Sequence, residues 1–149
     1  MKRIIMVCTG NTCRSPMAMA LMKKALAKRG LTSIEVSSAG MWAAHGERAS
    51  SNAILQMSRM GLDLSAHRSR NLRDAAIDDA LILCMTGSHT AAAKEIAPDA
   101  DVQLLTECAG LQGPIPDPYG GGIDIYEHCA HSMKRAIEII ADHISKGDQ

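Results

Sequence analysis

The sequence predicts one α/β domain in which helices cover both faces of a parallel β-sheet. Short apolar segments rich in β-branched residues alternate with longer segments whose apolar residues have helical spacing. This alternation favours parallel strands, because each helix carries the chain back to the same end of the sheet. A chain of 149 residues has about the length of one domain, and no linker or repeat divides it. We therefore expect a single domain over residues 1–149.

The elements can be assigned in order along the chain. Candidate strands are residues 3–8, 33–37, 80–85 and 101–105, and candidate helices are residues 15–29, 50–60, 87–97 and 123–146. In the first helix, Met19, Met22 and Leu26 have helical spacing, and Gly30 provides a stop. Before the last helix, residues 110–122 contain three prolines and five glycines, which exclude regular structure. A loop of this length in a compact domain usually has a function.

Charge and cysteine content argue against several classes of function. The sixteen basic and sixteen acidic side chains cancel and form no long block of one sign, so we expect neither a nucleic-acid partner nor a membrane partner. The apolar run after the basic start is shorter than the roughly 7–15 residues of a signal-peptide core, which predicts a cytoplasmic protein. Five cysteines favour free thiols over a disulfide framework, and no pair has the spacing of a zinc site.

The segment CTGNTCR, residues 8–14, has the chemistry of a phosphate site. Cys8 ends the first candidate strand, and small residues lead from it into a helix that opens with Ser15-Pro16. In open parallel sheets, ligands lie beyond the carboxyl ends of the strands, and amides at a helix N-terminus bind anions. The same surroundings favour a thiolate. Arg14 adds a planar guanidinium that donates to two phosphoryl oxygens. The spacing alone arises readily by chance, but in this context it predicts a nucleophile, Cys8, in a phosphate site.

A proton donor is expected from the loop at residues 110–122. Attack by a thiolate on a phosphoryl group needs an acid for the leaving group and then a base for the attacking water. Asp117 lies between prolines and glycines in this loop, and its carboxyl group suits both steps. An Asp-Pro pair is also a common start of a turn, so both interpretations stay open on these residues alone.

Two segments at opposite ends of the chain together resemble a known family. CTGNTCRSP (8–16) and DPYGGGIDIY (117–126) resemble the low-molecular-weight protein tyrosine phosphatases, and within them the bacterial protein-arginine phosphatase branch. SSAG (37–40), AHRSRNL (66–72) and LILCM (81–85) extend the resemblance over nearly the whole chain. The resemblance implies a four-stranded parallel sheet with flanking helices. It also implies a phosphatase that acts on phosphorylated proteins through a thiophosphate intermediate and releases inorganic phosphate.

The resemblance also implies a role for each residue of the site. Cys8 is the expected nucleophile, Arg14 the oxyanion clamp, and Asp117 the general acid and then base. The expected phosphate loop is Thr9, Gly10, Asn11, Thr12, Cys13 and Arg14. The expected supporting network is Asn11, Ser15, Ser38 and His67, and the expected specificity residues are Thr12, Trp42 and Tyr119. The resemblance implies no metal and no organic cofactor.

Thr12 bears on which phosphorylated side chain is the substrate. In the tyrosine-specific branch this position is typically a bulky aliphatic residue, whereas the arginine-specific branch resembles this chain in having threonine. A hydroxyl group can accept a hydrogen bond from a guanidinium or orient a water, whereas a phenyl ring favours an apolar wall. The glycines at 120–122 also replace the second tyrosine that many tyrosine-specific relatives have there. We therefore expect phosphoarginine, with phosphotyrosine as the alternative.

Two other functions are weaker candidates. Thiol-dependent arsenate reduction uses a similar site but needs a relay of further cysteines. Cys84 ends a candidate strand, yet the next cysteine is Cys108, which is too far along the chain for the expected relay. A phosphate-sensing module without turnover is hard to reconcile with the presence of Cys8, Arg14 and Asp117.

Cys13 suggests redox control of the same site. It lies in one loop with Cys8, so oxidation could join the two thiols in a disulfide that protects the nucleophile from further oxidation. A buried loop cysteine without a redox role is the alternative.

Overall fold

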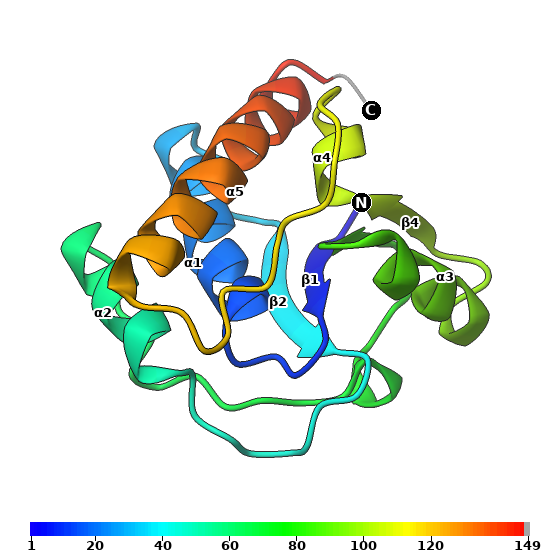
Figure 1. Ribbon diagram of the computed structural model, residues 1–149. Coiled ribbons are helices and arrows are strands. Elements are labelled where there is room, and N and C mark those ends of the chain that lie inside the picture. The colour runs from blue at the N-terminus through cyan, green and yellow to red at the C-terminus, as the bar shows by residue number, and fades with distance from the viewer. Residues whose placement is uncertain (148–149) are drawn as a thin grey trace.

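A four-stranded parallel sheet forms the centre of the molecule (Figure 1), in a computed structural model that describes residues 1–147. Its strands are β1 (Arg3–Cys8), β2 (Glu35–Gly40), β3 (Ala80–Cys84) and β4 (Asp101–Leu104), in the order β2-β1-β3-β4. The helices are α1 (Arg14–Lys28), α2 (Ser51–Arg59), α3 (Gly87–Ile96), α4 (Leu105–Cys108) and α5 (Ile123–Ser145), with a 3₁₀ turn, η1 (Leu72–Asp74). The predicted fold class is confirmed.

The two faces of the sheet bury different helices. Alternate residues of a strand point to opposite faces, so Ile4 and Met6 of β1 pack into a core with α1 and α5, whereas Ile5 and Val7 pack into a core with α3. All four side chains are fully buried. Figure 1 shows α1 and α5 together on one side of the sheet and α3 on the other. None of the helices within residues 1–147 is both long and apolar enough to cross a bilayer.

The register of β1 positions the candidate site. Cys8 pairs with Gly40 of β2, and Val7 pairs with Cys84 of β3. Because the strands are parallel, these carboxyl ends meet at one edge of the sheet, where the chain leaves β1 and enters α1. The edge therefore carries the predicted phosphate loop, at the place where open parallel sheets bind ligands.

Several predicted boundaries were wrong, most of them by one residue. The strand expected at residues 33–37 begins at Glu35 and continues to Gly40, because its polar and small residues pair with β1 as far as Cys8. The strand expected at 101–105 ends at Leu104, and the short helix α4 follows directly. Residues 110–122 contain no helix or strand, as predicted.

Candidate active site

The residues at the end of β1 and the loop before α5 enclose a small cavity. Its volume is about 220 Å³, and its lining residues are Cys8, Thr9, Gly10, Thr12, Cys13, Arg14, Asp117 and Tyr119. The structure thus brings together the predicted nucleophile, most of the predicted phosphate loop, and the predicted proton donor from the far end of the sequence. Asn11 is absent from this lining because its side chain is fully buried beneath the loop.

Asn11 fixes the shape of the phosphate loop. Its backbone has a φ of 58°, a left-handed conformation that asparagine tolerates better than most residues. The side-chain amide donates to the hydroxyl groups of Ser15 (2.8 Å) and Ser38 (2.9 Å), and its oxygen accepts from the backbone N–H of Arg70 (3.0 Å). The Nε2 atom of His67 lies 2.7 Å from the Asn11 carbonyl oxygen. All four residues of the predicted supporting network therefore meet at this loop.

The thiol of Cys8 lies against a hydroxyl group. Its Sγ is 2.9 Å from Oγ of Ser15, and the side chain is only 3 % exposed. Ser15 accepts from the Asn11 amide, and its own proton has two nearby acceptors, the Ala39 carbonyl oxygen at 3.3 Å and, when it is ionised, the closer Sγ of Cys8. Helix α1 begins at the same point and has no acidic residue in its first turn. Its free amides and positive dipole end therefore face the site.

Arg14 is buried beside the loop that carries Asp117. The guanidinium group donates through Nη1 to the carbonyl oxygen of Ile115 (2.9 Å) and through Nη2 to Oγ1 of Thr9 (3.5 Å). The same Nη2 lies 3.7 Å from Oδ2 of Asp117, whose side chain is 53 % exposed. The buried guanidinium is thus held at its edges, while the carboxyl group of Asp117 reaches solvent and the cavity.

Two of the predicted specificity residues have different surroundings. Tyr119 lines the cavity and is 79 % exposed. Trp42 is not among the lining residues; its ring lies beside the His89 ring, with centroids 6.3 Å apart. A role for Trp42 in the pocket itself therefore stays a prediction without a contact to support it.

Cys13, the predicted redox partner, lines the cavity together with Cys8, and both thiols are free. Its Sγ lies 3.3 Å from the hydroxyl oxygen of Tyr126 and donates to Oγ of Ser50 at 3.5 Å. A disulfide between Cys8 and Cys13 stays a prediction.

Three residues that support the site were not predicted from the residues themselves. Gly40 lies so close to the phosphate loop that an added Cβ would be 2.6 Å from the Thr9 carbonyl oxygen. Arg70 donates one hydrogen bond from its backbone N–H to Asn11, and a second from its guanidinium Nε to the Ser38 carbonyl oxygen (3.0 Å). His89 is 2 % exposed and contacts Thr9. A glycine at a strand end is the only local signal among the three.

Both histidines near the phosphate loop are shifted toward the neutral form. Burial lowers the pKa of His67, with a smaller opposing effect from its bond to Asn11. Burial, followed by the nearby Arg14 cation, lowers the pKa of His89 to about 4. Both rings are therefore uncharged at neutral pH.

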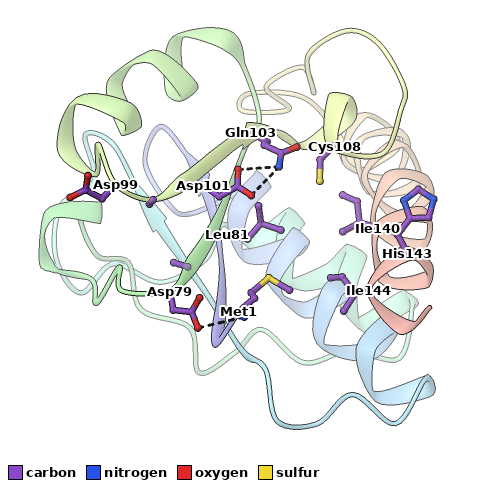
Figure 2. A pocket seen from close by; sticks show the side chains of 12 residues that line it. Met1, Asp79, Leu81, Asp99, Asp101, Gln103, Cys108, Ile140, His143 and Ile144 are labelled. Carbon is purple, nitrogen blue, oxygen red and sulfur yellow. Dashed lines mark hydrogen bonds and ion pairs between the residues drawn. The ribbon is translucent and has the colours of Figure 1, made fainter. Parts of the chain in front are cut away.

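A larger cavity of about 500 Å³ lies at the other end of the sheet (Figure 2). Apolar side chains of Leu81, Ile140 and Ile144 line it, together with carboxylates such as Asp79 and Asp101. No lysine or arginine is among its lining residues in the part of the chain that the structure describes. Its cysteine, Cys108, has a pKa raised to about 11, chiefly by burial. The carboxylates in this lining disfavour a phosphoryl group, and the Met1 amino group that also lines the cavity is paired with Asp79.

Comparison with known proteins assigns the family. The sequence model described as "Low molecular weight phosphotyrosine protein phosphatase" matches residues 3–149. A protein-arginine-phosphatase of Geobacillus stearothermophilus is 38 % identical over 146 residues, 95 % of each chain. The low molecular weight protein-tyrosine-phosphatase Etp of Escherichia coli is 33 % identical over 96 % of this chain and 95 % of its own.

Comparison with solved structures supports the same family. The YwlE arginine phosphatase, in a mutant with a phosphorylated active-site serine, superposes with a TM-score of 0.90 and 34 % identity over 97 % of this chain and 96 % of its own. The chain therefore belongs to the low molecular weight phosphotyrosine protein phosphatase family.

Proposed function

We propose that this protein hydrolyses phosphoarginine side chains of proteins, with Cys8 as the nucleophile. The chain is a protein phosphatase, as its family and its relatives named above indicate. The observation that carries the proposal is that Cys8, Arg14 and Asp117 line one cavity of about 220 Å³. Phosphoryl transfer through a covalent intermediate needs a nucleophile, a cation and a proton donor in this arrangement.

In the first step, the thiolate of Cys8 attacks phosphorus. An S–P bond forms as the P–N bond of phosphoarginine breaks, and its electron pair stays on the departing nitrogen, to which the carboxylic acid of Asp117 donates a proton. Arg14 has five N–H donors, of which Ile115 and Thr9 engage two. The remaining N–H groups are available to the phosphoryl oxygens.

In the second step, a water molecule attacks the phosphorus of the thiophosphate. The carboxylate of Asp117 accepts a proton from that water, the S–P bond breaks, and inorganic phosphate leaves. The electron pair returns to Sγ of Cys8, where the Ser15 hydroxyl at 2.9 Å can donate to the thiolate. The phosphorylated active-site serine of the YwlE mutant supports a covalent intermediate at this place in the fold.

Thr12 supports arginine as the substrate residue. It lines the cavity and is half-buried, so its side chain, which carries a hydroxyl group, borders the space in which the substrate side chain would lie. A guanidinium can donate to that hydroxyl, whereas a phenyl ring cannot. The names of the relatives from Geobacillus stearothermophilus and of YwlE point to the same substrate.

Phosphotyrosine is the alternative substrate, and Tyr119 is the observation in its favour. This exposed aromatic side chain lines the cavity and could pack against a phenyl ring.

Arsenate reduction is a weaker alternative, because burial raises the pKa of Cys84 to about 12 and its side chain is fully buried, which makes it a poor relay thiol. A cytoplasmic location also belongs to the proposal, supported by the odd number of cysteines, five.

The test compares kcat/KM on peptides of one sequence that carry phosphoarginine or phosphotyrosine. We expect the parent to prefer phosphoarginine and Thr12→Ile to reverse the preference. Thr12→Val removes the hydroxyl with little change in volume, so it separates polarity from size. Thr32→Ile, at an exposed position, is the control. If the parent preferred phosphotyrosine, the proposed substrate would be wrong but the proposed mechanism would stand. If turnover survived in Cys8→Ser, the proposed mechanism would be wrong.

A further inference from the structure

We propose that His89 is a positioning residue that orients Arg14 through the hydroxyl group of Thr9. The inference rests on the proposed function, in which Arg14 holds the phosphoryl oxygens. His89 belongs to α3, on the opposite face of the sheet from α1, and it does not line the cavity. Its hydrogen bond to Thr9 connects it to the phosphate loop.

Both ring nitrogens of His89 have a partner. Nδ1 lies 3.0 Å from Oγ1 of Thr86, the residue that caps the N-terminus of α3, and Nε2 lies 2.8 Å from Oγ1 of Thr9 in the phosphate loop. The ring is 2 % exposed and is thus fixed at both ends. A buried imidazole in this position connects the start of α3 to the phosphate loop.

The hydroxyl group of Thr9 contacts both the His89 ring and the guanidinium group of Arg14. Its Oγ1 accepts from Nη2 of Arg14 at 3.5 Å, and the same Nη2 lies 3.7 Å from the carboxylate of Asp117. Nη1 is already engaged with the carbonyl oxygen of Ile115. If the Thr9 hydroxyl group turned away from Arg14, Asp117 would be the remaining partner of Nη2 among these contacts. Arg14 and Asp117 would then pair with each other, and neither would be free to contact the substrate.

The surroundings of the ring favour its neutral form. A neutral imidazole has one donor and one acceptor, and a hydroxyl group can serve as the partner of either. Arg14 of α1 and Asp117 of the loop 110–122 are the charged groups that act on the ring; Arg14 lowers its pKa, after the larger effect of burial, and Asp117 opposes this. A charged ring would also be a second cation near Arg14. The Trp42 ring beside it, with centroids 6.3 Å apart, adds an uncharged neighbour.

A double-mutant cycle on phosphate binding tests the inference without turnover. Calorimetry would give the Kd of inorganic phosphate for the parent, His89→Leu, Thr9→Val and the double variant. Loss of one hydrogen bond corresponds to roughly a fivefold weaker affinity. We expect each single variant to bind about that much more weakly, and the double variant to bind no more weakly than either. Losses that multiply, or an unchanged Kd in His89→Leu, would overturn the inference.

A second variant separates positioning from folding. Glutamine can donate and accept at one end of a side chain, so His89→Gln should recover phosphate affinity toward the parent value, while the melting temperature of each variant reports stability. Lost stability with unchanged phosphate affinity in folded protein would contradict the role. The exposed His131→Leu is the control. Cys8-dependent hydrolysis by a parent whose His89 and Thr9 do not couple would sink this inference alone, whereas absence of any phosphopeptide hydrolysis would sink the proposed function.

Discussion

The two cavities lie at opposite ends of the sheet, and the smaller one contains the groups that suit phosphoryl chemistry. The larger, of about 500 Å³, contains apolar side chains, carboxylates and a thiol whose pKa burial raises to about 11. The smaller, of about 220 Å³, contains a thiol beside a hydroxyl group, a buried guanidinium and the start of a helix. The larger contains one cysteine, Cys108, and the smaller contains two, Cys8 and Cys13. What a thiol can do is decided by the groups that stabilise its charge, and not by the space around it.

Replacement of the two cysteines should show the largest contrast. Cys8→Ser should abolish turnover of phosphopeptides, because a serine hydroxyl in this site is a far weaker nucleophile than a thiolate, yet inorganic phosphate should still bind. Cys108→Ser, in the larger cavity, should leave kcat/KM within about twofold, as is usual for positions outside a site. Measurable turnover in Cys8→Ser, or equal losses in both variants, would remove the contrast.

Replacement of two aspartates should give a smaller contrast. Asp117→Asn should lower kcat by about 10²–10⁴, the range for loss of general acid–base catalysis, and by less on aryl phosphates whose leaving group needs no proton. Asp101→Asn at the rim of the larger cavity should have no such effect. The measurement is kcat across aryl phosphates of graded leaving-group pKa. Equal losses across the series would take the acid role away from Asp117.

Two glycines offer a test of the backbone near the smaller cavity. Gly40→Ala adds a Cβ 2.6 Å from the Thr9 carbonyl oxygen, so the phosphate loop must shift. We expect a destabilisation of about 1–3 kcal/mol, typical of overpacking, with weaker phosphate binding. Gly87→Ala, whose added Cβ meets no atom within 4 Å, is the matched control. Urea denaturation and phosphate calorimetry would measure both effects, and a Gly40→Ala variant that behaves like the control would contradict this packing.

Two titratable groups, His89 behind the smaller cavity and Cys108 in the larger one, should lower the stability of the protein at opposite ends of the pH scale. The pKa of His89 falls from 6.5 to about 4 on folding, so the unfolded chain binds the proton first, and stability drops as pH falls from 6.5 toward 4. The pKa of Cys108 rises from 9.0 to about 11, so stability drops as pH rises through that range. In urea midpoints measured across pH, His89→Gln should reduce the slope of the acid limb. Cys108→Ser should reduce the slope of the alkaline limb, to which Cys84 and Cys129 also contribute. A parent-like acid limb in His89→Gln, or a parent-like alkaline limb in Cys108→Ser, would contradict the assignment.

From the residues themselves, the sequence predicted mainly the part of the site that is local, whereas the distant Ser38 and His67 were expected only from the family resemblance. Cys8 and Arg14 share one loop, where strand end, small residues and helix start can be read together, and Asp117 could be added because its proline- and glycine-rich loop is conspicuous. Thr9 and His89 meet across 80 positions, and the backbone of Arg70 reaches Asn11 across 59. No periodicity or spacing signals such contacts, because they depend on how α3 and the segment after α2 pack against the sheet.

The same limit applies to the fold. Segments with strong apolar patterns gave the strands and helices, and hence the sheet, with few errors. The boundary of β2 was wrong because residues 37–40 are small or polar, and their strand conformation comes from pairing with β1 rather than from their own preference. The placement of Trp42 beside His89 likewise depends on tertiary contacts.

The bond between Arg14 and Ile115 spans 101 positions of the chain. During synthesis, the nucleophile emerges from the ribosome early, but the loop that completes the site is made only after most of the chain has been translated. A growing chain therefore carries the phosphate loop without its proton donor. The cavity that joins residues 8–14 to Asp117, the proposed proton donor, can form only after residues 110–122 have been made.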